Sequence, residues 1–188
     1  SGSDAVNAAV RITTDTEEQF IELMNQKVNE LGLTHTHFSN AVGKDKDNYS
    51  SVYDIGKIME YCLKNEMFKE IISTDTYYVE DLDIQINGPL YKMDKKYGVD
   101  VSLINGSKSG FTTLAKHSLV SYGEKDNVTY IVVTAYADSY KELLLDNSGI
   151  YNYFFSNYGY KDYNINFDIK IEDSEEALYN VNVDTNVY

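Results

Sequence analysis

The chain has 188 residues, is 43% hydrophobic and carries a net charge of −14, with Arg11 as its only arginine. This length suits one globular domain with at most a short additional unit. The acidic charge argues against a basic nucleic-acid-binding surface, so we expect no nucleic-acid partner. No apolar run is long enough to cross a bilayer.

The first third of the chain predicts helices around one loop. Residues 3–11 are alanine-rich and begin with polar residues that can cap a helix. A second helix is predicted after Thr16, with an apolar residue every three or four positions until Gly32 ends it. The stretch 34–49 has no sustained period and predicts a loop. Ser51 and Asp54 then have the spacing of a capping box, which predicts the start of a third helix.

The middle and the end of the chain predict a sheet. A short helix is expected over 66–73, and the alternation of 76–88 predicts one half-buried strand. The segments 117–123 and 128–137 are apolar and flank a polar turn, so they predict an antiparallel hairpin. A helix is expected from Asp138 or Ser139 onward. Helices followed by an antiparallel sheet define an α+β fold.

Residues 108–112 read "KSGFT" and lie just ahead of a predicted strand. Acyl transfer by a serine enzyme needs a nucleophile, a base, an oxyanion hole and a cation for the substrate carboxylate. One recurrent solution uses three separate motifs: S-x-x-K, S-x-N and K-T-G. Lys108, Ser109 and Gly110 match the third motif, with Thr112 two residues further on. By itself, such a triplet also suits a solvated turn.

Two other stretches make the match specific. Residues 1–5, "SGSDA", resemble the S-G-N-D-A form of the second motif. Residues 20–63 contain "MNQKVNELGLTHTHFSNAVG" and then "SSVYD" at the opening of a helix. In order and spacing these residues resemble the D-alanyl-D-alanine carboxypeptidases, the low-molecular-weight penicillin-binding proteins. The resemblance covers roughly residues 1–160, and residues 161–188 resemble the start of a further β-rich domain.

The resemblance implies a β-lactamase/transpeptidase-like fold in which a helical lobe lies beside an antiparallel sheet. It implies removal of the terminal D-alanine of peptidoglycan stem peptides through an acyl-serine intermediate, without a cofactor. β-Lactams are expected to acylate the same serine. The protein is then expected outside the cytoplasm, in the bacterial cell envelope. The implied roles are proton relay for Ser1, substrate-amide contact for Ser3, and carboxylate binding for Lys108, Ser109 and Thr112 beside Gly110.

Three features depart from this pattern. No serine is followed by lysine three positions later, so we expect the nucleophile and its helix to come from a missing N-terminal segment or from another chain. The 188 residues alone are then expected to be inactive. Ser3 stands where the pattern has asparagine, unless "SGS" is a cloning remnant. No arginine follows Lys108, and Lys141 is the nearest cation in the expected region.

Other interpretations follow from these departures. A non-catalytic module that binds wall peptides or a partner protein is the main alternative, and a β-lactamase shares the three motifs. Cys62 lies at helical spacing with apolar residues and predicts a packing role. His35, His37 and His117 are expected to be structural, and no metal-binding motif is present.

Overall fold

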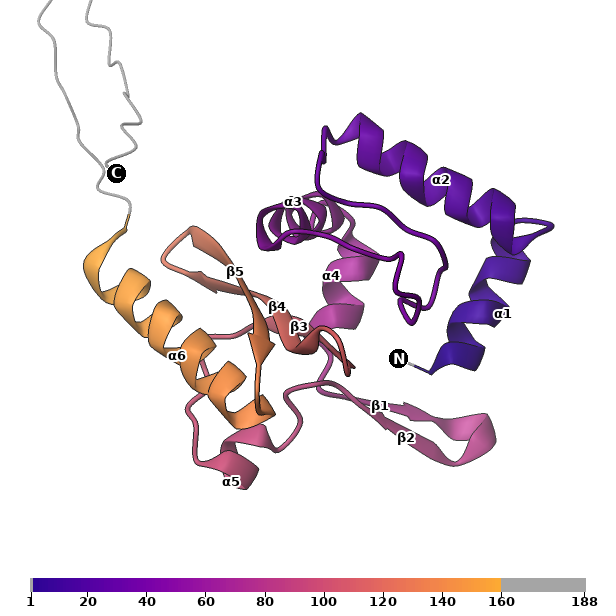
Figure 1. The fold of residues 1–188 in the computed structure, drawn as a ribbon. Helices are drawn as coiled ribbons and strands as arrows, with labels where there is room; N and C mark the ends of the chain where they lie inside the picture. The colour runs from indigo at the N-terminus through magenta and orange to yellow at the C-terminus, as the bar shows by residue number, and fades with distance from the viewer. Residues whose placement is uncertain (1, 160–188) are drawn as a thin grey trace, which may run out of the picture.

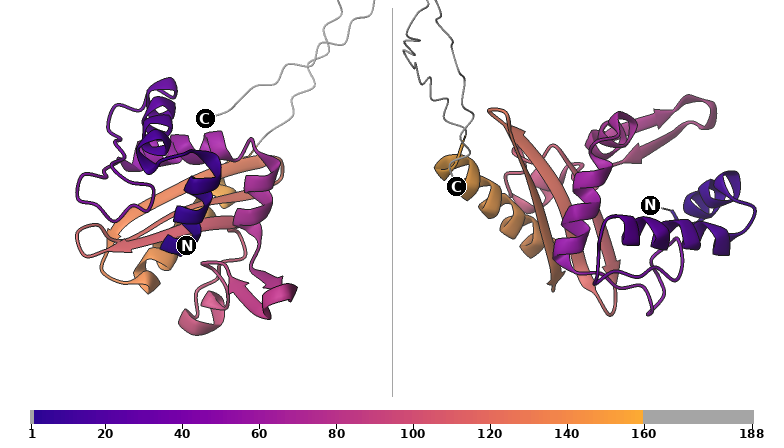
Figure 2. Two further views of the ribbon diagram at one scale, coloured as in Figure 1. Left: turned by 90° about the vertical axis from the view of Figure 1, so that its right-hand side faces the viewer. Right: turned by 90° about the horizontal axis from the view of Figure 1, so that it is seen from above.

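The computed structural model describes residues 2–159, which form a layered α+β fold (Figure 1). A three-stranded antiparallel sheet lies in the middle, with one helix on one face and the remaining long helices on the other (Figure 2). The predicted α+β class is confirmed. In chain order the elements are α1 (Ser3–Thr13), α2 (Glu17–Glu30), α3 (Val52–Cys62), α4 (Glu66–Ser73), β1 (Thr76–Val79), the 3-10 turn η1 (Glu80–Leu82), β2 (Ile84–Asn87), α5 (Met93–Tyr97), β3 (Gly106–Thr112), β4 (Lys116–Lys125), β5 (Val128–Ala137) and α6 (Tyr140–Asn157).

Strands β3, β4 and β5 pair antiparallel in chain order. The predicted β4–β5 hairpin is confirmed. Its turn uses two left-handed residues, Asp126 with φ 52° and Asn127 with φ 62°, which matches the right-handed twist of paired strands. A register shift between His117 and Leu119 marks a β-bulge near the other end of β4. Strands β3 and β5 are the two edges of this sheet.

Helix α6 lies across β4 and β5 and covers the main core. Leu119 of β4 contacts Leu143 of α6, and both side chains are fully buried. Each such side chain contributes about 2 kcal/mol of hydrophobic stabilisation. The predicted start of the helix is confirmed, because Ser139 and Glu142 form a reciprocal capping box.

Helix α2 begins and ends as its sequence predicts. Helix α1 begins at Ser3 after Gly2, and no side chain caps it, so the capping predicted for its first polar residues is wrong. Thr16 caps α2 and forms a reciprocal capping box with Gln19. The chain leaves this helix through Gly32, whose φ of 68° is easily adopted only by glycine. The apolar Val28 lies buried on the inner face of α2.

Helix α3 begins differently from the prediction. Ser51 accepts a hydrogen bond from the backbone N–H of Asp54, as expected for an N-cap. The Asp54 side chain, however, does not return to the backbone of Ser51. Its carboxylate instead binds the preceding loop at His35 and Thr36. The predicted capping box is therefore wrong, because the carboxylate accepts from His35 and Thr36 of the loop instead.

The single strand predicted over 76–88 is also wrong. The segment forms two four-residue strands, β1 and β2, which pair antiparallel with Tyr77 opposite Ile86. Asp83, at φ 52°, reverses the chain between them. Figures 1 and 2 show this hairpin projecting away from the sheet. Period-two alternation continued across the reversal, so the pattern did not reveal the turn.

The β-rich unit expected over residues 161–188 lies outside the described residues. The division at residue 160 stays a prediction. Within residues 2–159, no helix is long and apolar enough to pass through a membrane.

Candidate active site

Strand β3 carries the third motif on an edge of the sheet. Successive side chains of a strand point to opposite faces, so Lys108, Gly110 and Thr112 share one face with Gly106. A Cβ at Gly106 would lie 2.9 Å from the carbonyl oxygen of Ile72 in α4. This face is therefore the one that α3 and α4 partly cover. Figure 2 shows α1 and α2 on the same side of the sheet.

Ser109 occupies the opposite face. Its cross-strand partner is Leu119, which is buried against α6. The hydroxyl of Tyr140, at the start of α6, donates a hydrogen bond to the carbonyl oxygen of Pro89 at 3.0 Å. Burial raises the pKa of Tyr140, and the nearby Ser109 hydroxyl partly opposes that effect. The structure thus separates the Ser109 hydroxyl from Lys108 and Thr112, with which the sequence grouped it.

Lys108 projects from the centre of β3. Its ammonium group donates a hydrogen bond to the carbonyl oxygen of Ser109. Partial burial lowers the pKa of Lys108, because desolvation disfavours the charged form. Within residues 2–159, no carboxylate forms an ion pair with it. A lysine without an acidic partner is suited to binding the carboxylate of a ligand.

Gly110 is exposed, and a Cβ built on it would meet no atom within 4 Å. Gly123, on β4, differs sharply, because its Cβ would lie 2.2 Å from the carbonyl oxygen of Leu103. Gly123 is required by packing, whereas Gly110 is not. Gly110 also lacks the positive φ that favours glycine. What the glycine at 110 preserves is open space along the strand, where a ligand backbone can approach closely.

Thr112 ends β3, and its hydroxyl accepts a hydrogen bond from the backbone N–H of Ala115 at 2.9 Å. Its cross-strand partner is Lys116, which has a left-handed φ of 53°. The Lys116 ammonium pairs with Asp138 and lies 4.4 Å from the ring centroid of Tyr136. A cation therefore lies opposite Thr112. In the sequence, Lys141 was the nearest cation in the expected region; the pairing of residue 112 with residue 116 across a tight turn is the signal that points to Lys116 instead.

The second motif lies at the start of α1. Ser1 is outside the described residues, so its predicted role is not placed. Ser3 is the first residue of α1, and its hydroxyl accepts a hydrogen bond from the ammonium of Lys44 at 2.8 Å. No hydrogen bond or ion pair joins α1 to β3 among the residues that the structure describes. In residues 2–159 the two motif elements thus share one side of the sheet, with no hydrogen bond or ion pair between them.

The loop between α2 and α3 is held by buried polar side chains. Asn25 of α2 donates to the carbonyl of Phe38 at 2.7 Å and accepts from its N–H at 3.0 Å. Asp54, only 3% exposed, accepts from the N–H of His35 and the hydroxyl of Thr36. These hydrogen bonds lower the pKa of Asp54, the bond from Thr36 most of all. The residues of the "MNQK" and "SSVYD" stretches therefore act by fixing the loop that carries Lys44.

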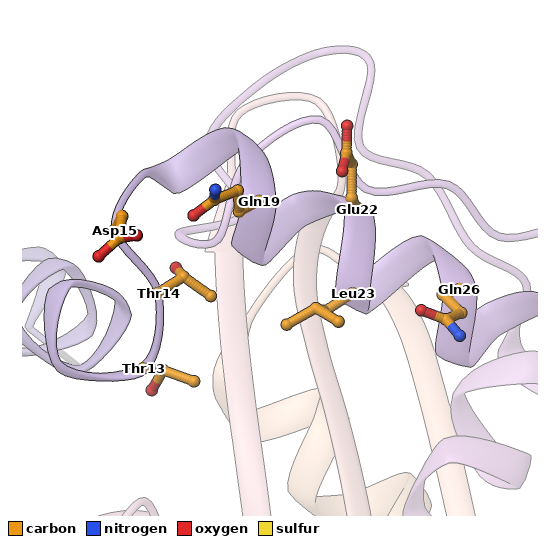
Figure 3. Close-up of a pocket in the computed structure, with 7 residues that line it drawn as sticks. All are labelled: Thr13, Thr14, Asp15, Gln19, Glu22, Leu23 and Gln26. Carbon is orange, nitrogen blue, oxygen red and sulfur yellow. The ribbon is translucent and has the colours of Figure 1, made fainter.

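A pocket of about 450 Å³ lies where α1 meets α2 (Figure 3). Its lining is mostly polar and includes none of the predicted site residues. The lining residues are Thr13, Thr14, Asp15, Gln19, Glu22, Leu23 and Gln26. Figure 3 shows Thr13 and Leu23 pointing into the angle between the two helices. The pocket contains no cation, so it does not suit the carboxylate-binding chemistry expected of β3.

The remaining candidates are packing residues. Burial raises the pKa of the Cys62 thiol, which disfavours a reactive thiolate. His117 stacks near Phe111 at a centroid separation of 4.5 Å, and His37 lies against Tyr49. Residues 2–159 contain no group of three or more potential metal ligands.

The fold is that of the penicillin-binding and DD-peptidase class. The D-alanyl-D-alanine carboxypeptidase DacD from Francisella tularensis matches it with a TM-score of 0.73 at 19% identity, over 88% of this chain and 51% of that one. The Streptomyces DD-transpeptidase matches with a TM-score of 0.62 at 25% identity, over 74% and 55% of the two chains.

Sequence comparison identifies the family. A family model described as D-alanyl-D-alanine carboxypeptidase matches residues 1–139. The D-alanyl-D-alanine carboxypeptidase DacF of Bacillus subtilis is 32% identical over 166 residues, which are 84% of this chain and 40% of that protein. The chain belongs to the D-alanyl-D-alanine carboxypeptidase family. It spans less than half the length of this relative.

Proposed function

We propose that this chain is the substrate-binding part of a serine-type D-alanyl-D-alanine carboxypeptidase. It acts in the bacterial cell envelope on peptidoglycan stem peptides, and its serine is acylated by the substrate and by β-lactams. Lys108 and Thr112 bind the terminal carboxylate. Ser109 contributes its main chain at the strand edge, because its hydroxyl faces α6. Ser1 relays a proton.

The observation that carries this proposal is the open space at Gly110. Neither packing nor backbone conformation requires glycine there. Among residues 2–159, the position lies two residues after a lysine that forms no ion pair, on a strand whose outer edge is not paired with another strand. A ligand backbone aligned along β3 uses all three properties: the free edge, the missing side chain and the cation. The family to which the chain belongs performs the matching chemistry.

The nucleophile, in this proposal, comes from a segment outside the 188 residues, because no serine in them is followed by lysine at the third position. That segment occupies the space between the α1 start and β3. The 188 residues alone therefore do not turn over substrate, and activity returns when the segment is supplied.

The test is covalent labelling with a fluorescent penicillin, followed by denaturing gel and mass spectrometry. The chain is incubated alone and together with a polypeptide that carries the S-x-x-K segment. We expect label on the added segment, in the mixture only. Label on the 188-residue chain alone would overturn the assignment of the nucleophile. If neither incubation gave label, the assignment as an enzyme would be wrong, and the alternative of a non-catalytic peptide-binding module would remain.

Two matched glycine variants test whether the rate of labelling depends on β3. Gly110→Ala and Gly149→Ala both add a methyl group where no atom lies within 4 Å. Only Gly110→Ala places its methyl group in the open space along β3, where we propose that the substrate backbone lies. We expect Gly110→Ala to slow labelling at least about tenfold, equivalent to about 1.4 kcal/mol, and Gly149→Ala to leave it unchanged. Equal rates would remove Gly110 from the site.

A further inference from the structure

Lys44 reaches the second motif from a distant part of the chain. Its ammonium donates to the Ser3 hydroxyl at 2.8 Å across 41 positions of sequence. Ser3 opens α1 and is the residue for which the family resemblance implies the substrate-amide contact. Lys44 itself lies in the irregular loop between α2 and α3, in which the sequence suggested no site residue.

The loop presents Lys44 from a fixed position. The side-chain oxygen of Asn40 accepts hydrogen bonds from the N–H groups of Val42 at 3.1 Å and Gly43 at 2.7 Å. Asn48 donates to the same oxygen at 3.0 Å. Gly43 has a φ of 79°, so the backbone turns sharply just before Lys44. The turn aims the lysine back toward α1.

The charge of Lys44 is available to a ligand. In the part of the chain that the structure describes, no carboxylate pairs with its ammonium. The adjacent Asp45 uses its side chain to accept from the N–H of Asp47 at 2.8 Å. An ammonium has three N–H donors, and Ser3 takes one of them. Two donors remain for a ligand beside Ser3.

We propose that Lys44 is a substrate-binding residue that works as a pair with Ser3. This inference rests on the proposed function. Serine is too short to supply both the donor and the acceptor that a peptide amide requires. The ammonium of Lys44 donates to the carbonyl oxygen of the acyl-donor peptide. The Ser3 hydroxyl accepts from Lys44 with one lone pair and from the peptide N–H with the other. The pair does together what one longer amide side chain does alone.

Two measurements on the 188-residue chain test this. In the first, NMR of 13Cε-labelled lysines compares wild type with Ser3→Ala. We expect the Lys44 resonance to shift and the Lys46 resonance, from the same exposed loop, to stay. In the second, a diacetyl-L-lysyl-D-alanyl-D-alanine tripeptide is titrated into wild type, Lys44→Met and Lys46→Met. We expect Lys44→Met to weaken binding about tenfold, and Lys46→Met to change it less than twofold.

A rescue variant separates binding from a merely structural role. In a Ser3→Asn background the amide provides the missing donor, so Lys44→Met should weaken tripeptide binding less than about threefold. Equal losses in both backgrounds would overturn the paired role. Equal binding by wild type and Lys44→Met would overturn the inference and leave the proposed function standing. A Lys44 signal that responds to Ser3→Ala, with no tripeptide bound even by wild type, would overturn the proposed function and Lys44's role together.

Discussion

The carboxylate of Asp54 accepts a hydrogen bond from the backbone N–H of His35 at 2.9 Å, which ties the first turn of α3 to the loop that carries Lys44. The same oxygen accepts from the hydroxyl of Thr36 at 2.8 Å. Thr36 in turn shares a hydrogen bond with Ser50 at 2.7 Å. One buried acid thus organises both ends of the loop.

We predict that this contact makes stability depend on pH. The folded-state pKa of Asp54 is lowered, so its contribution is present above the unfolded value of about 3.9. It is lost as the pH falls through the folded value. Asp54→Asn should lower stability at pH 7 in urea unfolding, and should lose less stability than wild type between pH 5 and about pH 3. Asp81→Asn, at an exposed position, is the control. If it changed the pH dependence of stability as much as Asp54→Asn does, the cause would be the lost net charge and not the buried hydrogen bonds.

The polar cluster under α6 provides a second prediction. Asn147 is fully buried, accepts from Ser121 at 2.9 Å and donates to Thr134 at 2.7 Å. Asn147→Ala removes these bonds and leaves a cavity, so it should cost about 3 kcal/mol in chemical denaturation. Asn152→Ala, exposed on the same helix, should change stability by less than about 0.5 kcal/mol. Similar losses in both variants would show that helix propensity, not the cluster, sets the cost.

Substitutions at Gly110 and Gly123 should differ in their effect on stability, because we propose that Gly110 serves binding and Gly123 serves packing. Gly123→Ala forces its methyl group against Leu103 and against the ring of Tyr151, 2.9 Å away. We expect a loss of at least about 2 kcal/mol in the free energy of unfolding. Gly110→Ala meets no neighbour and should hold or slightly raise stability, by up to about 1 kcal/mol. Thermal and urea unfolding measure the stability of both variants. If Gly110→Ala were destabilising, the fold would require glycine at this position and our interpretation would be wrong.

We predict that the chain self-associates through the outer edge of β5. The strand "VTYIVVTAYA" has no charge, and Ile131 and Val133 border a pocket of about 380 Å³ beside α3. Unpaired strand edges of this composition pair with other chains. Sedimentation velocity should show larger species as concentration rises, and Ile131→Lys should reduce them. Ile12→Lys, on the 88%-exposed Ile12 of α1, should not. A purely monomeric wild type at high concentration would contradict the prediction.

The sequence determined most elements directly, because their signals are local. Thr16 and Ser139 cap helices through side chains three residues from their partners. Gly32 ends α2 through its own backbone conformation. The β4–β5 hairpin follows from two apolar runs around a polar turn. The spacing of "SGSDA", "MNQK" and "KSG" carried the family, since short motifs in order survive where overall identity does not.

Tertiary structure alone decided how these residues meet. Alternation along β3 is visible in the sequence, but which face is open depends on where α4 and α6 pack. That packing put the Ser109 hydroxyl against Tyr140 and left Lys108, Gly110 and Thr112 on the other side. Asp54 does not form its predicted capping box, because the fold brings the N–H of His35 and the hydroxyl of Thr36 to its carboxylate. Lys44 reaches Ser3 only through the folded loop, since contacts across 41 positions leave no local pattern.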